Sequence, residues 1–281
     1  MAEHRSEGPS IAIVVLTHSR VHLLRQCVEN VLSKVSAHSR EIIIWNNGST
    51  DGTRAYLDSL APDPRRRVIH HPTNFGQNAY ADAFRMTTSD YFVKLDDDVI
   101  DAPPEWDETL LDSIERLPQF GLLAASLVDD PNDASAYTMY HLRWHLYSED
   151  EVNGVRLLRG PTGGGATITP RSVNEAVGGY RQKRQPFWLE AAEYIGRLND
   201  HGYEVATIAD LKIHHAGGPY YSRQPSAKLD YWRRYHRKVR WKNAVKRALL
   251  RVPKVAALNE RKMWFQAPDA APQPSPTASD S

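Results

Sequence analysis

The segment YFVKLDDD, residues 91–98, is a mostly apolar run that leads directly into three adjacent aspartates. Residues 91–95 predict a buried strand, so the aspartates follow its carboxyl end. Adjacent carboxylates repel one another, whereas Mg²⁺ or Mn²⁺ stabilises them because these ions take oxygen ligands and bridge carboxylates to phosphates. We therefore expect Asp96 and Asp98 to face a metal and a diphosphate while Asp97 points elsewhere. The alternative is a solvated acidic turn.

The residues before this segment alternate short apolar runs with amphipathic stretches. We expect strands at 11–16, 42–45, 68–70 and 91–95, and helices at 23–32, 51–60 and 77–86. This alternation predicts an α/β fold with a mainly parallel sheet flanked by helices, which binds ligands at the carboxyl ends of its strands. Polar clusters follow three of the strands, at 17–20, 46–51 and 96–98.

A different pattern follows residue 101. We expect a helix at 103–117, a strand at 122–127, a strand-like segment at 137–146, a helix after Pro170, a helix at about 187–201, and closing strands at 204–208 and 212–214. The final residues, 266–281, are rich in Pro, Ala, Ser and Asp without an apolar period, so they predict disorder.

Bulk composition excludes several classes of protein. With 281 residues, 41% hydrophobic and 25% charged, the chain is an ordinary globular protein. Ten Lys or Arg fall between Arg233 and Lys254; without them the net charge of +1 becomes −9, which argues against a nucleic-acid binder. The single cysteine, Cys27, cannot form an internal disulfide, and no apolar run is long enough for a signal peptide or a membrane span. We expect a cytoplasmic protein.

The second polar cluster, Asn46 to Thr53, joins the second strand to a helix. Its amide and carboxamide groups can read the edge of a nucleobase, or the segment can be an ordinary capped turn. No G-x-G-x-x-G segment occurs in the chain, which counts against a dinucleotide-dependent dehydrogenase.

Taken together, these segments resemble the family 2 inverting glycosyltransferases, which have the GT-A fold, over residues 11–218. Seven segments in the family's order carry the resemblance: Thr17-His18-Ser19-Arg20, Asn46 to Thr53, Asn74 to Asn78, Asp96-Asp97-Asp98 as the D-x-D motif, Gly163-Gly164-Gly165 through Arg171 to Val177-Gly178-Gly179-Tyr180, Glu190 to Tyr203, and His214 or His215.

The resemblance implies an enzyme that moves a sugar from a nucleoside-diphosphate sugar to an acceptor hydroxyl, with inversion and with Mg²⁺ or Mn²⁺. It assigns the nucleotide-sugar pocket to Thr17, Arg20, Asn46, Asp51, Asn78, Asp96 and Asp97, the metal to Asp96, Asp98 and His214, and the positions facing the donor or acceptor sugar to Gly164, Gly165 and Trp188. The implied division is a flexible N-terminus (1–10), a nucleotide-sugar-binding half (11–102), an acceptor-binding and catalytic half (103–218), a basic helical extension (219–265) and a disordered tail (266–281).

Two residues depart from the family's pattern. Asn46 stands where the family carries an aspartate that faces the base; an amide oxygen still accepts a hydrogen bond from a pyrimidine N3–H, so we expect a UDP or dTDP sugar. Ala191 stands where the family carries its general base. Glu190 and Glu193 are the candidate replacements, being neighbours on one helix face. Arg197 offers Glu193 an ordinary ion pair, so Glu190 is favoured as the base.

Two other functions are consistent with parts of the pattern. A sugar-phosphate nucleotidyltransferase has a similar sheet, but no glycine-rich phosphate loop with Lys or Arg follows the first strand. A non-catalytic protein that binds sugar nucleotides or carbohydrates would fit Ala191. The three aspartates argue against it, because metal ligands have no purpose without a diphosphate.

The basic segment after residue 231 has an apolar period of its own. Trp241, Val245, Ala248 and Val252 recur at helical spacing among the cations. A basic amphipathic helix of this kind lies on the inner face of an anionic membrane or docks on the acidic part of the same chain, and both alternatives remain open.

Overall fold

The computed structural model describes residues 8–129, 147–162, 164–183 and 190–216, with isolated positions at 237, 241, 245, 248, 249 and 252. The chain divides into two compact units, Met1–Gln224 and Pro225–Ser281. The strand-like segment 137–146, Gly163, Trp188 and the tail 266–281 lie outside the described residues. None of the helices among the described residues has the length and hydropathy to cross a lipid bilayer.

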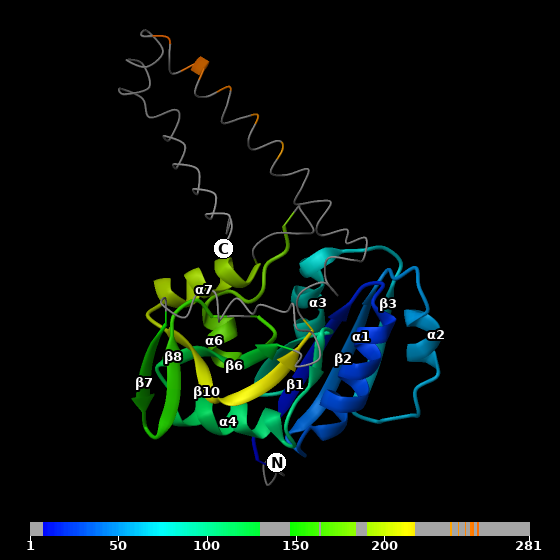
Figure 1. Ribbon diagram of the computed structural model, residues 1–281, viewed down its shortest axis with the longest axis horizontal. Coiled ribbons are helices and arrows are strands. Elements are labelled where there is room, and N and C mark those ends of the chain that lie inside the picture. Colours follow the sequence, from blue (N-terminus) through cyan, green and yellow to red (C-terminus); the bar gives the residue numbers. More distant parts are fainter. Residues whose placement is uncertain are drawn as a thin grey trace, which may run out of the picture. The chain divides into compact units, whose positions relative to one another are not determined.

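Four parallel strands form the first part of the sheet, in the order β3-β2-β1-β4. They are β1 (Ile11–Thr17), β2 (Ser39–Asn47), β3 (Arg66–His71) and β4 (Tyr91–Asp96). Figure 1 shows β1, β2 and β3 beside α1, α2 and α3. Leu16 of β1 is in register with Asp96 of β4, so the carboxyl ends of these two strands lie side by side.

Helices cover both faces of this part of the sheet. α1 (Val21–Gln26) continues into a π-helical turn at Cys27–Val31, and α2 (Thr53–Asp58) and α3 (Ala79–Arg85) follow β2 and β3. Side chains alternate between faces along a strand. In β4, Val93 and Leu95 join the core that includes residues of α1, whereas Phe92 packs against residues of α3.

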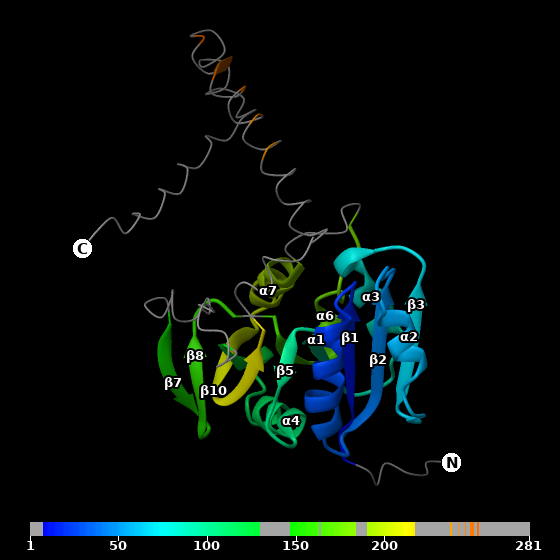
Figure 2. The same cartoon turned by 45° about the vertical axis from the view of Figure 1, so that its right-hand side comes forward.

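The second part of the sheet is mixed and continues in the order β4-β9-β6-β10-β8-β7. Figure 2 shows its far edge, where β10, β8 and β7 lie side by side. Its strands are β6 (Phe120–Asp129), β7 (Ser148–Val152), β8 (Val155–Arg159), β9 (Ala166–Pro170) and β10 (Glu204–His215), with β5 (Val99–Asp101) paired to β10. The helices are α4 (Trp106–Arg116), α6 (Arg171–Ala176) and α7 (Glu190–Asp200). β9 runs antiparallel to both β4 and β6. The predicted α/β class with a mainly parallel central sheet is confirmed.

Three features of the second part differ from the expected elements. The closing strands expected at 204–208 and 212–214 are one strand, β10, whose register with β6 shifts between Ile208 and Lys212. β5, β9 and the β7–β8 hairpin are additional strands. The hairpin had a sequence signal: Asn153-Gly154, both at positive φ (48° and 73°), is the residue pair that tight two-residue hairpin turns favour.

Candidate functional site

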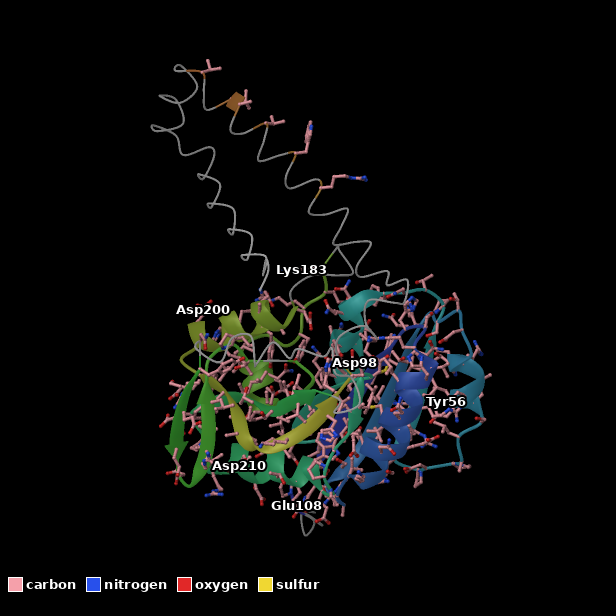
Figure 3. The ribbon with its side chains drawn as sticks, viewed as in Figure 1. Tyr56, Asp98, Glu108, Lys183, Asp200 and Asp210 are labelled. Carbon is pink, nitrogen blue, oxygen red and sulfur yellow. The ribbon has the colours of Figure 1, made fainter. Side chains whose placement is uncertain are left out.

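The three aspartates stand at the end of β4, as expected, but in unlike surroundings. Asp97 and Asp98 are only 1% and 2% exposed, whereas the side chain of Asp96 is 35% exposed. In Figure 3, Asp98 lies in the interior of the view, whereas Glu108 and Asp210 are at its lower rim. Burial of two adjacent carboxylates is unfavourable unless they are paired, so their partners define the site.

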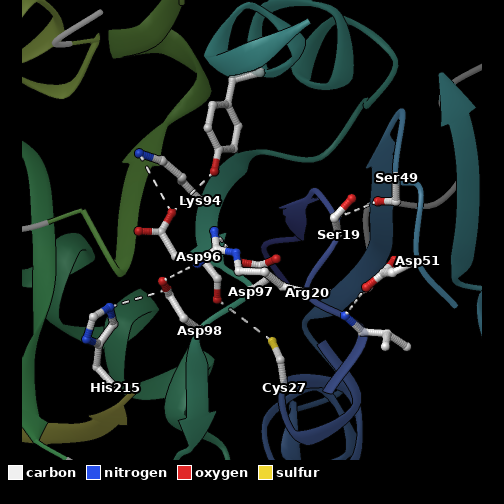
Figure 4. Close-up of polar contacts among 12 residues, drawn as sticks. Ser19, Arg20, Cys27, Ser49, Asp51, Lys94, Asp96, Asp97, Asp98 and His215 are labelled. Atoms are coloured by element: carbon white, nitrogen blue, oxygen red, sulfur yellow. Dashed lines mark hydrogen bonds and ion pairs between the residues drawn. The ribbon is translucent and has the colours of Figure 1, made fainter. Parts of the chain in front are cut away.

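Arg20, in the turn between β1 and α1, is the first partner. Its Nη2 lies 2.9 Å from Oδ1 of Asp97, and its Nη1 donates a hydrogen bond of 2.8 Å to Oδ2 of Asp98 (Figure 4). Burial raises the pKa of Asp97 to about 7, although Arg20 acts in the opposite direction. Burial also acts to raise the pKa of Asp98, but His215 and Arg20 hold it well below its usual range. Arg20 was expected in the nucleotide pocket, and in the structure its guanidinium group forms ion pairs with Asp97 and Asp98.

The histidine beside Asp98 is His215. Its Nε2 lies 3.3 Å from Oδ1 of Asp98, whereas Nδ1 of His214 lies 3.9 Å from Oδ2 of Asp101 and the His214 side chain is 41% exposed. Burial alone would lower the pKa of His215, but Asp98 outweighs burial and raises it. The pairing of β10 with β5 is irregular between His214 and His215, and His215 is the one that lies beside Asp98. His214, which was expected at the metal, lies nearer to Asp101, and its role in metal binding stays a prediction.

A second ion pair lies on the other side of Asp96. Nζ of Lys94 donates a hydrogen bond of 2.7 Å to Oε1 of Glu190, and the two side chains are 7% and 6% exposed. The same nitrogen lies 4.0 Å from Oδ1 of Asp96 and 4.8 Å from the centre of the Tyr80 ring. Burial acts to lower the pKa of Lys94, but Glu190 and Asp96 together raise it well above its ordinary value. Two carboxylates from different elements thus share one buried ammonium.

Residues 12–178, more than half of the chain, match the model of glycosyl transferase family 2. The chain belongs to this family. Its α/β sheet is consistent with the GT-A fold.

Individual relatives are distant. An uncharacterized glycosyltransferase of Haemophilus influenzae is 26% identical over 110 residues, which are 38% of this chain and 33% of that protein. The chain therefore spans about a third of the length of this relative. A mannosyltransferase from Pyrobaculum calidifontis, in complex with GDP-Man and Mn²⁺, has a TM-score of 0.56 at 18% identity, covering 81% of this chain and 61% of that one. GalNAc-T7, with UDP, GalNAc and Mn²⁺, has a TM-score of 0.54 at 13% identity, covering 80% and 47%. At these identities the two structures support the fold alone.

In this member of glycosyl transferase family 2, Lys94 is a residue of the site that the sequence analysis did not predict, although the sequence carries a signal for it. A lysine inside a run that predicts a buried strand must have a partner, since unpaired buried charges are very costly. Alternation places Phe92, Lys94 and Asp96 on one face of β4. The partner, Glu190, is 96 residues away, so no local pattern identifies it.

Glu193, the other candidate base, is held by arginines. Oε2 accepts a hydrogen bond of 3.0 Å from Arg197, and Oε1 lies 3.4 Å from Nη1 of Arg181. Arg197 also donates to the backbone carbonyls of Val177 and Gly179. The expected ion pair between Glu193 and Arg197 is confirmed, and the hydrogen bonds of Arg197 to Val177 and Gly179 join α7 to the chain after α6.

Asn46 and Asp51 are occupied by hydrogen bonds within the protein. Oδ1 of Asn46 accepts from the backbone N–H of Ser49 at 3.1 Å, its Nδ2 donates to His70 at 3.0 Å, and the residue is 3% exposed. The oxygen that was expected to meet a pyrimidine N3–H is thus engaged. Asp51 accepts from the backbone N–H groups of Val21 and Thr53, both at 3.0 Å, so one carboxylate holds the beginnings of α1 and α2.

The other residues predicted for the nucleotide and sugar pockets make different contacts in the structure. Thr17 is buried at the end of β1. Asn78 exchanges two hydrogen bonds of 2.9 Å with the backbone of Lys183. Gly165 accepts a hydrogen bond of 2.8 Å from the N–H of Asp96, and a Cβ on Gly164 would lie 3.3 Å from Nζ of Lys94.

The aspartates fit a divalent cation only together with a substrate. Among the described residues, no three His, Cys, Asp or Glu side chains are arranged to hold a metal by themselves. Oδ1 of Asp98 is buried, and Nε2 of His215 lies 3.3 Å from it. Mg²⁺ is commonly bound through one or two carboxylates, with substrate phosphates and water as its other ligands. Asp96 and Asp98 supply oxygen ligands of this kind.

Proposed function

We propose that this enzyme transfers a sugar from a nucleoside-diphosphate sugar to an acceptor hydroxyl, with inversion at the anomeric carbon and with Mg²⁺ or Mn²⁺. One observation carries the proposal: the carboxylates of Asp96 and Glu190 lie within 4.0 Å of one buried ammonium, that of Lys94. This places a residue of the D-x-D motif beside a carboxylate of the acceptor-side helix, α7.

The proposed reaction is a single displacement. The acceptor oxygen attacks the anomeric carbon as the bond from that carbon to the diphosphate oxygen breaks, and the electron pair leaves with the diphosphate. Glu190 takes the proton of the acceptor hydroxyl, with Oε2 as the receiving atom because Oε1 is held by Lys94. Attack opposite the leaving group inverts the anomeric centre.

Asp96 and Asp98 would hold the cation, with His215 as the neighbour of Asp98. When bound, the ion supplies positive charge that stabilises the departing diphosphate. Two neighbours in fold were solved with Mn²⁺ and a nucleotide or nucleotide sugar, which supports the same use here. Arg20 pairs with Asp98 in the structure and, once released, has a diphosphate as its natural partner because guanidinium groups bind phosphates well.

We propose no single nucleotide base for the donor. A UDP or dTDP sugar was expected because Asn46 was free to accept from a pyrimidine, but its oxygen accepts from Ser49 instead. The two neighbours bind GDP-Man and UDP. A donor screen must therefore include purine and pyrimidine nucleotide sugars.

One observation favours a second candidate, a non-catalytic protein that binds a sugar nucleotide. Residue 191 is alanine, so the carboxylate that the family has there is absent from α7. Such a protein would bind the donor without turnover. The buried Lys94–Glu190 pair favours the enzyme, since it supplies a held carboxylate from the adjacent position.

Thermal shift with UDP, dTDP and GDP sugars, each with and without Mn²⁺, identifies the donor, and release of free sugar or nucleoside diphosphate then measures turnover. We expect metal-dependent stabilisation by one donor class, followed by donor hydrolysis or transfer. Stabilisation without any turnover would establish the binding protein instead. Neither effect with any donor would contradict the proposed function.

We further propose that the basic segment 233–254 contacts an anionic membrane surface. The described positions 237, 241, 245, 248 and 249 are helical, and the large apolar side chains Trp241, Val245, Leu249 and Val252 are exposed, Trp241 by 68%. Their spacing places them on one helix face. The ten cations of the segment suit anionic lipids, each adding about 1 kcal/mol near the surface.

Co-sedimentation with phosphatidylserine-containing vesicles at low salt tests this contact, with phosphatidylcholine vesicles as the control. We expect binding that weakens with salt and with Trp241→Ala. Absence of binding at low salt would leave the alternative in which the helix docks on the acidic part of the chain.

A further inference from the structure

We infer that Lys94 is a positioning residue of the transfer reaction, which holds Glu190 and Asp96 at one fixed site; this rests on the proposed function. Lys94 lies in β4, two residues before Asp96, and its ammonium donates to Oε1 of Glu190 at 2.7 Å. One strand thereby supplies both the first aspartate of the cluster and the cation that orients the base.

The surroundings of Lys94 hold its ammonium in place from several directions. The Tyr80 ring of α3 lies on one side, with its centre 4.8 Å from Nζ, and the Tyr80 hydroxyl donates to Oδ1 of Asp96 at 3.3 Å. On another side, a Cβ added to Gly164 would come within 3.3 Å of Nζ. With Glu190 in front, the ammonium has little room to move, and neither does the carboxylate it holds.

Burial makes this pair more than a surface ion pair. The two side chains are 7% and 6% exposed, so water does not compete for either charge. Removing one member of such a pair leaves the other as an unpaired buried charge, which is strongly unfavourable, so the two side chains stay together. Lys94 therefore sets the position of the base.

Loss of the ammonium has a distinct kinetic consequence. Lys94→Met keeps a long apolar side chain but removes the ammonium. We expect kcat to fall about 10–100-fold, because small displacements of a catalytic group cost up to about 100-fold, while KM for the donor stays near the wild-type value. A loss of fold would instead lower the amount of active enzyme and its thermal stability without separating kcat from KM in this way.

A double-mutant cycle separates positioning through Glu190 from an independent role. In a Glu190→Gln background, Lys94→Met should lower kcat little further, because its target is already gone. Multiplicative losses would mean that Lys94 acts on the substrate directly and would overturn the inference. Gly164→Ala displaces the ammonium without removing it, so it should lower kcat by less than Lys94→Met does. This variant tests the inference if Lys94→Met does not fold.

Lys34→Met is the matched control. Nζ of Lys34 also pairs with a carboxylate, Asp101, at 2.5 Å, but lies outside the site and is 34% exposed. Its removal should leave kcat and the donor KM unchanged. If Lys94→Met also leaves kcat unchanged, Lys94 has only a structural role and the inference fails. If the wild-type enzyme turns over no nucleotide sugar, the proposed function fails instead, a result visible before any variant is made.

Discussion

Two carboxylates near the end of β4, those of Asp98 and Glu190, differ in the exposure of the cations that neutralise them. Asp98 is paired with Arg20 and His215, whose side chains keep 28% and 22% of their surface exposed, whereas Lys94 and Glu190 are nearly inaccessible to water. A partly exposed cation is solvated when it leaves, but the buried carboxylate of Asp98 then needs another positive charge, which a bound metal ion would supply. Separating Lys94 from Glu190 leaves two unsolvated charges. We therefore expect the partners of Asp98 to be exchangeable and the partner of Glu190 to be permanent.

This difference matches the two roles proposed for the carboxylates. The charge around Asp98 changes when a cation and a diphosphate arrive, so exchangeable partners suit it. Glu190 must present one oxygen in the same place in every turnover, so a permanent partner suits it. Substitutions on either side test this distinction.

The largest loss of activity is expected from Asp98→Asn. A bound cation stabilises the departing diphosphate by several kcal/mol, so its loss should reduce turnover by about 10³-fold or more. Thermal stability should change little, because Arg20 keeps Asp97 as a partner. Turnover and Mn²⁺-dependent donor binding are measured against Asp101→Asn, which removes a carboxylate outside the cluster. Near-normal turnover in Asp98→Asn would remove Asp98 from the proposed metal site.

Glu190→Gln should come next. Glutamine keeps the shape and accepts a hydrogen bond from Lys94 but cannot take a proton, so kcat should fall about 10²–10⁴-fold at unchanged donor affinity. Glu193→Gln is the matched control, since it lies on the same helix and pairs with Arg197. It should affect mainly stability. A large loss in Glu193→Gln beside a mild one in Glu190→Gln would reverse the two roles, as single-turnover transfer would show.

His215→Gln should have an intermediate effect. Because His215 neighbours the buried oxygen of Asp98, its replacement should weaken Mn²⁺ binding in the presence of nucleotide by about 10-fold, the size found for residues that support metal ligands. Isothermal titration gives the affinity directly. His214→Gln, which alters the exposed neighbour, should leave it unchanged, and the opposite ranking of the two variants would assign metal binding to His214 instead.

The smallest effect is expected from Asp51→Ala, and on stability only. Loss of a helix cap costs about 0.5–2 kcal/mol of unfolding free energy, whereas Asp51→Asn retains an acceptor and should cost less. Partial burial opposes it, but hydrogen bonds from Thr53 and Val21 lower the pKa of Asp51. Its stabilisation is therefore present above the unfolded pKa of about 3.9 and lost as the pH falls below it. Chemical denaturation at pH 7 and pH 3 measures this, and a raised donor KM at normal stability would make Asp51 a nucleotide contact instead.

The order of strands and helices up to Asp98 followed from the sequence by itself. Hydrophobic period and turn residues are local properties, so β1 to β4, α2 and α3 were predicted near their observed places. The sequence also predicted the cluster of three aspartates, the ion pair between Glu193 and Arg197, and the glycosyltransferase family, since each depends on residues close together in the chain.

Partners distant in the chain were decided only by the tertiary structure. Lys94 of β4 meets Glu190, the first residue of α7, although 96 residues separate them. Arg20 meets Asp97 and Asp98 because β1 and β4 are neighbours. The placement of His215 rather than His214 beside Asp98 depends on the pairing of β10, whose register shifts before it reaches this aspartate. A sequence displays which charges a chain carries, but which of them share a buried space depends on packing between elements, and here that packing separates an exchangeable charge from a permanent one.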